Sequence, residues 1–116
     1  MTKNLLEIQR RIIELRDARD WKQFHTPKDM ALSLVLEAAE FMEHFQWKTE
    51  DECLQHLENH KEAVAEELVD VLYWVLLIAN DFNVDLYDTS LKKLKKTEEK
   101  YSVEKSKGNH KKYTEL

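Results

Sequence analysis

Two pairs of carboxylates are the part of this sequence most suited to chemistry. Glu37 and Glu40 form the first pair, Glu67 and Asp70 form the second, and 26 residues separate the two pairs. Both stretches favour a helix, on which side chains three residues apart share a face with Cβ atoms ~5–6 Å apart. Each pair can therefore offer two carboxylates to one cation.

Apolar residues surround both pairs. Between Leu68 and Ala79 the only charged residue is Asp70, and a helix that is apolar on all sides is normally buried. A buried carboxylate without a partner takes up a proton or binds a cation, since leaving it unpaired costs several kcal/mol. The sequence offers no obvious matching arginine, so we expect the two helices to pack with the pairs facing each other around a divalent cation.

The ligand type favours Mg²⁺ or Mn²⁺ over zinc, because all the donors are oxygens. A di-iron site is the alternative in a helical protein, but it usually carries Glu-x-x-His on two helices. None of the five histidines has a glutamate three residues before it. A single Glu-x-x-Glu is typical of a solvated helix face, so the metal-site hypothesis depends on both pairs.

Glu43 lies one turn beyond Glu40. It could help to hold a second ion or a water; the alternative is that it is a surface residue.

The composition indicates one all-α domain. Gly108 and Pro27 are the only glycine and proline among 116 residues, whereas a many-stranded β fold usually needs more turn-forming residues. The single cysteine, Cys53, excludes an internal disulfide and is typical of a reduced, cytoplasmic chain. The longest apolar run, residues 71–79, is far shorter than the ~20 residues of a membrane-spanning helix. We therefore expect neither a signal peptide nor membrane association.

Hydrophobic periodicity predicts four main helices. Their expected ranges are residues 4–20, 27–46, 62–81 and about 86–101. Thr26 suits the N-cap of the second helix and Pro27 its first position, and we expect one buried stripe on that helix: Met30, Leu34, Ala38, Phe41 and Phe45. Thr49 and Glu52 resemble a capping box that opens a short fifth helix.

These helices define a domain over residues 1–101, followed by a polar tail over residues 102–116 that we expect to be extended or partly disordered unless a partner chain holds it. A four-to-five-helix bundle of this size has too little surface to bury the whole of the helix over 62–81. We therefore expect oligomerisation to complete the bundle, as a homodimer or a dimer of dimers.

The charge is unevenly distributed. The formal net charge is -5, but residues 1–90 hold 9 Lys+Arg against 19 Asp+Glu, and residues 91–116 hold 9 against 4. An acidic body argues against a nucleic-acid binder, which would present a broad basic face. The basic segment could instead receive phosphates bridged to cations in the body; a solvated helix face is the alternative.

Two aromatic blocks join the acidic pairs in a recognisable pattern: Arg19-Asp20-Trp21-x-Gln23-Phe24-His25-x-Pro27 and Glu40-x-x-Glu43-x-Phe45-Gln46-Trp47. Over about residues 5–101 the pattern resembles the all-α nucleotide pyrophosphohydrolases of the MazG-like superfamily, and within it the short dCTP pyrophosphatase branch. The resemblance implies a Mg²⁺-dependent enzyme that cleaves a nucleoside triphosphate, dCTP-like or noncanonical, to the monophosphate and pyrophosphate. This would be a housecleaning role. The alternative is a non-catalytic helical nucleotide-binding or regulatory oligomer.

The same resemblance assigns roles to individual residues. The four paired acids would be the metal ligands, with Mn²⁺ able to replace Mg²⁺, and either Glu40 or Glu43 would orient or deprotonate the attacking water. The substrate-binding residues would be Trp21, Trp47, His25, Trp74, Lys93 and Thr97. Relatives often carry Tyr at the position of Trp74 and Asn at that of Thr97, which leaves the preferred base open.

Overall fold

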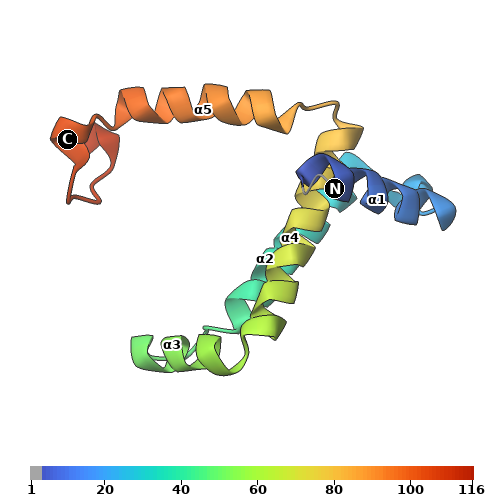
Figure 1. The fold of residues 1–116 in the computed structure, drawn as a ribbon, viewed down its shortest axis with the longest axis horizontal. Coiled ribbons are helices and arrows are strands. Elements are labelled where there is room, and N and C mark those ends of the chain that lie inside the picture. Colours follow the sequence, from blue (N-terminus) through green and yellow to red (C-terminus); the bar gives the residue numbers. More distant parts are fainter. Residues whose placement is uncertain (1–3) are drawn as a thin grey trace. The chain divides into compact units, whose positions relative to one another are not determined.

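Helix α4 (Lys61–Asp81) is the element on which the first part of the chain is built (Figure 1). The computed structural model describes residues 4–116, which are helical without any strand and so confirm the all-α prediction. The chain divides into two compact units at Phe82. The helices of the first unit are α1 (Leu5–Ala18), the 3₁₀ turn η1 (Lys22–Phe24), α2 (Pro27–Glu43), α3 (Glu50–Asn59) and α4.

Helix α2 lies along α4 and runs antiparallel to it (Figure 1). It begins as the sequence predicts, because Thr26 Oγ1 accepts a hydrogen bond from the backbone N–H of Asp29 at 3.2 Å and Pro27 takes the first helical position. It ends at Glu43, three residues earlier than the range 27–46. The chain turns there, and Trp47 has a φ of 68°, in the left-handed region that a continuing helix excludes.

The short helix α3 starts with the predicted capping box. Thr49 Oγ1 accepts from the N–H of Glu52 at 3.2 Å, and Glu52 Oε1 accepts from the N–H of Thr49 at 2.9 Å. The backbone N–H groups of Thr49 and Glu52, which have no partner within the helix, are thereby hydrogen-bonded. The start of α3 is therefore fixed at the residues that the sequence predicted.

Helix α1 crosses the C-terminal half of α4 (Figure 1). Gln9 Nε2 donates to the carbonyl of Leu76 at 2.8 Å, and Arg16 Nη1 lies 2.7 Å from Asp81 Oδ2. The guanidinium of Arg16 is only 1% exposed, so this ion pair is buried between the two helices. Two polar contacts thus tie α1 to α4.

Few large side chains are fully buried in one chain. Among residues 4–116, the buried apolar residues are Met30, Val64, Leu76, Leu77 and Ala79. The expected stripe on α2 is only partly right, because Met30 is buried while Ala38 is exposed. Full burial of α4 is also not observed within the chain, since Leu68 and Val69 are more than half exposed.

The second unit, residues 83–116, contains α5 (Leu86–Lys100), α6 (Val103–Ser106) and the 3₁₀ turn η2 (Tyr113–Glu115). Asp85 caps α5 by accepting from the N–H of Asp88 at 2.9 Å. The tail is not wholly extended as expected. Tyr113 folds back against Tyr101 with ring centroids 5.9 Å apart, and Lys100 Nζ lies 4.8 Å from the Tyr113 ring. Across residues 4–116, none of the helices has both the length and the apolar character that a membrane span requires.

Candidate active site

Four carboxylates meet at the interface between α2 and α4. One ligand oxygen from each of Glu37, Glu40, Glu67 and Asp70 can be chosen so that all four lie within 4.8 Å of one another. The antiparallel packing brings the two i, i+3 pairs together, which the spacing predicted. Four oxygen donors at this separation could hold a divalent cation.

Two of these acids have an oxygen that lacks a hydrogen-bond partner. Glu37 and Glu67 are half-buried, and the Oε2 atom of each is buried without a hydrogen-bond partner. Burial raises the pKa of Glu37, and the nearby Glu40, Asp70 and Glu67 raise it further. The pKa of Glu67 is also raised, first by burial and then by Glu40 and Asp70. A divalent cation would supply the missing partner for both oxygens, so the donor set fits such an ion.

An aromatic pair adjoins the cluster along α4. Trp74 lies one helical turn beyond Asp70, and its ring meets the imidazole of His25 edge-to-face with centroids 5.2 Å apart. His25 Nδ1 is buried and has no hydrogen-bond partner. Burial lowers the pKa of His25, and the nearby Arg16 lowers it further. The structure therefore favours a neutral imidazole at His25, packed against Trp74 and with one ring nitrogen unpartnered.

The other predicted substrate residues are not gathered in the same way. Trp21 is partly exposed, with the guanidinium carbon of Arg19 5.7 Å from its ring. Trp47 is 93% exposed in the turn after α2. Glu43, the last residue of α2, is exposed. Their roles stay predictions.

Lys93 and Thr97 both lie on α5 of the second unit. The hydroxyl of Thr97 donates to the carbonyl of Lys93 at 3.1 Å, so the two residues share one face of the helix. Their contacts with a substrate also stay predictions.

Two features were missed by reasoning from the sequence. The first is the buried Arg16–Asp81 pair, whose members lie 65 residues apart and share no motif. The second is a group of histidines around His44, for which the only signal was the proximity of His56 and His60 in the sequence. Neither feature follows from helical periodicity, because each depends on how separate helices pack.

Comparison with known proteins decides the family. The MazG-like family model matches residues 32–116, a range that includes both acidic pairs. The chain belongs to the MazG-like family. The resemblance seen in the sequence is thereby confirmed.

Relatives of this MazG-like chain include the dCTP pyrophosphatase 1 proteins of Mus musculus and Homo sapiens. They are 39% and 38% identical to it over 114 residues, which are 97% of this chain and 67% of each relative. Among solved structures, a pyrophosphatase from Archaeoglobus fulgidus is 35% identical and superposes with a TM-score of 0.81, covering 88% of this chain and 95% of that one. By these matches the chain is a nucleoside triphosphate pyrophosphohydrolase.

Proposed function

We propose that this MazG-like enzyme hydrolyses dCTP, or a modified deoxycytidine triphosphate, to the monophosphate and pyrophosphate with Mg²⁺ as the cofactor. The observation that carries the proposal is the cluster of four carboxylates between α2 and α4. The choice of dCTP rests on the relatives, which are dCTP pyrophosphatases. Removing such nucleotides would be a housecleaning role.

Glu37, Glu40, Glu67 and Asp70 would hold the metal, and Mn²⁺ could take the place of Mg²⁺. When bound, the ion neutralises phosphate oxygens and lowers the pKa of a coordinated water. The two acids with raised pKa, Glu37 and Glu67, must lose their protons to serve as ligands. Protons and metal therefore compete for the cluster, and activity should fall in mild acid.

The reaction needs a carboxylate that accepts a proton from the attacking water. Glu40 and Glu43 are the candidates, since both are exposed on the last two turns of α2. The water oxygen bonds to the α phosphorus while the bond from that phosphorus to the bridging oxygen of the β phosphate breaks. Pyrophosphate then leaves with that bridging oxygen.

The base would be bound by aromatic side chains, because stacking on a ring is worth ~1–3 kcal/mol per base. His25 and Trp74 already form an edge-to-face pair, and Trp74 lies one helical turn beyond Asp70. Trp21 and Trp47 offer further exposed rings.

Lys93 would bind the β and γ phosphates, with Thr97 beside it on α5. A lysine ammonium carries the charge needed to bind these groups in the outgoing pyrophosphate. The basic segment of the sequence would thus contribute to substrate binding.

A homodimer or dimer of dimers would cover the apolar surface that one chain leaves open. Val35, Leu36, Leu68 and Val69 lie on α2 and α4 and are each more than half exposed. Such patches are characteristic of protein interfaces. Sedimentation velocity should therefore give a mass at least twice that of the 13.9 kDa chain.

A panel of nucleoside triphosphates, assayed for pyrophosphate release with Mg²⁺, tests the proposed activity. We expect dCTP and its modified forms to give the highest kcat/KM, and Glu40→Gln or Asp70→Asn to abolish release. Glu58→Gln, at an exposed position on α3, is the matched control and should retain full activity. Nucleotide binding without any product in the wild type would contradict the proposal.

A further inference from the structure

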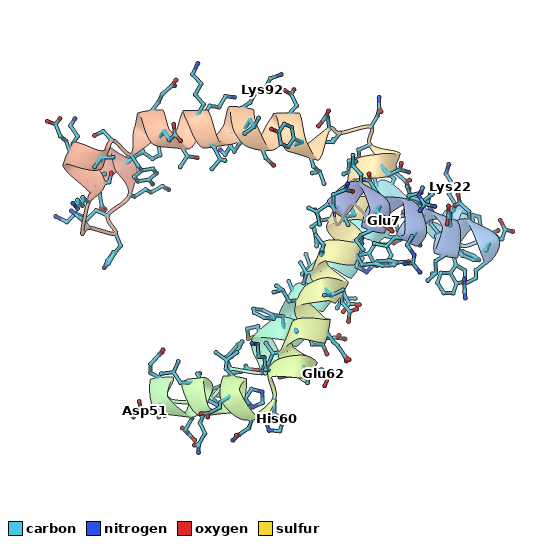
Figure 2. All side chains as sticks on the ribbon, viewed as in Figure 1. Glu7, Lys22, Asp51, His60, Glu62 and Lys92 are labelled. Atoms are coloured by element: carbon cyan, nitrogen blue, oxygen red, sulfur yellow. The ribbon has the colours of Figure 1, made fainter. Side chains whose placement is uncertain are left out.

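Three imidazoles gather where α2, α3 and α4 succeed one another, and His44 among them lies four residues beyond Glu40 of the carboxylate cluster. His44 follows the last residue of α2, His56 lies within α3, and His60 is the junction residue between α3 and α4. Figure 2 shows His60 at this corner of the chain. The ring centroids of His44 and His56 are 5.1 Å apart, and those of His56 and His60 are 4.6 Å apart.

Two ring nitrogens of the group already face each other. His44 Nδ1 lies 2.9 Å from His56 Nε2, so one ring donates its N–H to the unprotonated nitrogen of the other. A zinc ion bound to both nitrogens at 2.0–2.1 Å in tetrahedral geometry would hold them about 3.3 Å apart. A metal could therefore replace the bridging proton if the rings separated by about 0.4 Å.

The hydrogen bond between His44 Nδ1 and His56 Nε2 requires that at least one of these two rings is neutral. A neutral imidazole has a lone pair available, whereas an imidazolium has none. His44 and His56 are half-buried, which restricts their rings, while His60 is exposed and free to rotate.

We propose that His44, His56 and His60 form a binding site for a first-row transition-metal ion that prefers imidazole ligands. Zn²⁺ is the ion that we expect to bind there. His44 and His56 provide the preformed pair. His60 completes the set by rotating about its side-chain bonds, because within residues 4–116 only the carboxylate cluster already has three or more donors within 4.8 Å of one another. Three imidazoles leave a fourth position to solvent.

This histidine site differs chemically from the carboxylate cluster. Imidazole nitrogen suits Zn²⁺, Cu²⁺ and Ni²⁺, whereas carboxylate oxygen suits Mg²⁺ and Mn²⁺. The two sites can therefore be separated by the choice of ion, and the inference does not depend on the proposed catalytic function. A bound ion would join α2 to α3 and fix the corner that leads into α4.

Calorimetric titration of the untagged full chain with Zn²⁺, in an excess of Mg²⁺ to occupy the carboxylates, tests the inference. We expect one Zn²⁺ site that His56→Gln weakens by about 100-fold or more, since even the outer partners of metal ligands contribute 10- to 100-fold. His110→Gln removes a histidine from the second unit and is the matched control, with unchanged binding. Equal affinity in wild type and His56→Gln, or no Zn²⁺ binding above that of the carboxylates, would overturn the proposal.

A measurement on the wild type covers the case in which a variant fails to fold. In nitrogen-15 spectra of the imidazoles, adding Zn²⁺ should shift the resonances of His44 Nδ1, His56 Nε2 and one nitrogen of His60. The resonances of His25 and His110 should stay in place. If the three clustered histidines do not respond, the site does not exist.

Discussion

Glu37 of α2 and Glu67 of α4 present ligand oxygens within 4.8 Å of each other, and each keeps a buried Oε2 atom without a hydrogen-bond partner. Two like charges held so close in a partly buried setting repel each other and lack solvation. The folded chain therefore carries an electrostatic cost at this interface that binding of a cation would remove.

The first prediction concerns the pH dependence of that cost. The pKa of Glu37 is raised in the folded chain above its ordinary 4.5, so the folded state binds a proton that the unfolded state has lost. The contribution of Glu37 to stability therefore falls as the pH rises from 4.5 through the raised pKa, and is constant above it. In EDTA, the Tm of Glu37→Gln should exceed that of the wild type by a larger margin at about pH 7 than at about pH 5.

Differential scanning calorimetry of both proteins at the two pH values makes this comparison. Glu58→Gln serves as the control, because an exposed glutamate on α3 should change Tm equally at both. A gain for Glu37→Gln that is larger at the lower pH would show that Glu37 is not the acid with the raised pKa.

The second prediction concerns the buried ion pair between α1 and α4. Burial alone would raise the pKa of Asp81, but the hydrogen bonds from Arg16 and Asn80 and the nearby charge of Arg16 together outweigh it and hold that pKa below 3.8. Asp81→Asn leaves the guanidinium of Arg16 without its main partner, and breaking a buried pair in this way costs about 3 kcal/mol. Urea denaturation at neutral pH should show this loss, and the difference from wild type should shrink as the pH falls below 3.8.

Arg10→Gln is the matched control for that experiment. Arg10 and Glu14 form an ion pair of the same 2.7 Å length, but both side chains are more than 60% exposed. Exposed pairs contribute about 0.5 kcal/mol. Equal losses for Asp81→Asn and Arg10→Gln would mean that burial does not strengthen the Arg16–Asp81 pair.

The third prediction concerns Trp47, whose left-handed backbone costs the folded chain about 1 kcal/mol compared with glycine. Because its side chain is 93% exposed, little packing is lost on replacement. Trp47→Gly should therefore leave stability unchanged or raise it by about 1 kcal/mol. If the indole stacks on the base, the KM for dCTP should rise about 5- to 150-fold. Asn83→Gly, also at positive φ, should leave KM unchanged, and an unchanged KM in Trp47→Gly would remove that residue from the site.

The fourth prediction separates two lysines of α5. Lys93→Gln should lower kcat/KM for dCTP about 10-fold, the value of a charge-assisted hydrogen bond to phosphate. Lys95 projects from the opposite side of the same helix, about 200° away. Lys95→Gln should therefore have less than a twofold effect on kcat/KM. Equal effects would indicate a general attraction of the basic segment for phosphate.

Local chemistry made much of the fold predictable. Thr26 begins α2 where predicted, α5 begins at the expected residue 86, and the capping box of Thr49 and Glu52 forms both of its hydrogen bonds. Caps depend on residues a few positions apart, so the sequence alone contains the necessary information. The carboxylate cluster was equally predictable from the sequence, because two i, i+3 pairs in apolar helices come together when those helices pack with the pairs facing each other.

Contacts between distant segments were not predictable in the same way. The partner of Arg16 is 65 residues away in the sequence, and neither residue belongs to a motif that points to the other. The end of α2 at Glu43 depends on the left-handed turn at Trp47, a conformation that a tryptophan rarely takes. Such features follow from how the helices cross, which periodicity does not determine.

The most direct test of the central claim is phosphorus-31 NMR of dCTP incubated with the enzyme, with and without Mg²⁺. We predict that the enzyme replaces the triphosphate signals by those of dCMP and pyrophosphate only when Mg²⁺ is present. Asp70→Asn should leave dCTP intact while remaining folded. Release of inorganic phosphate with dCDP, or equal turnover in Asp70→Asn, would contradict the account.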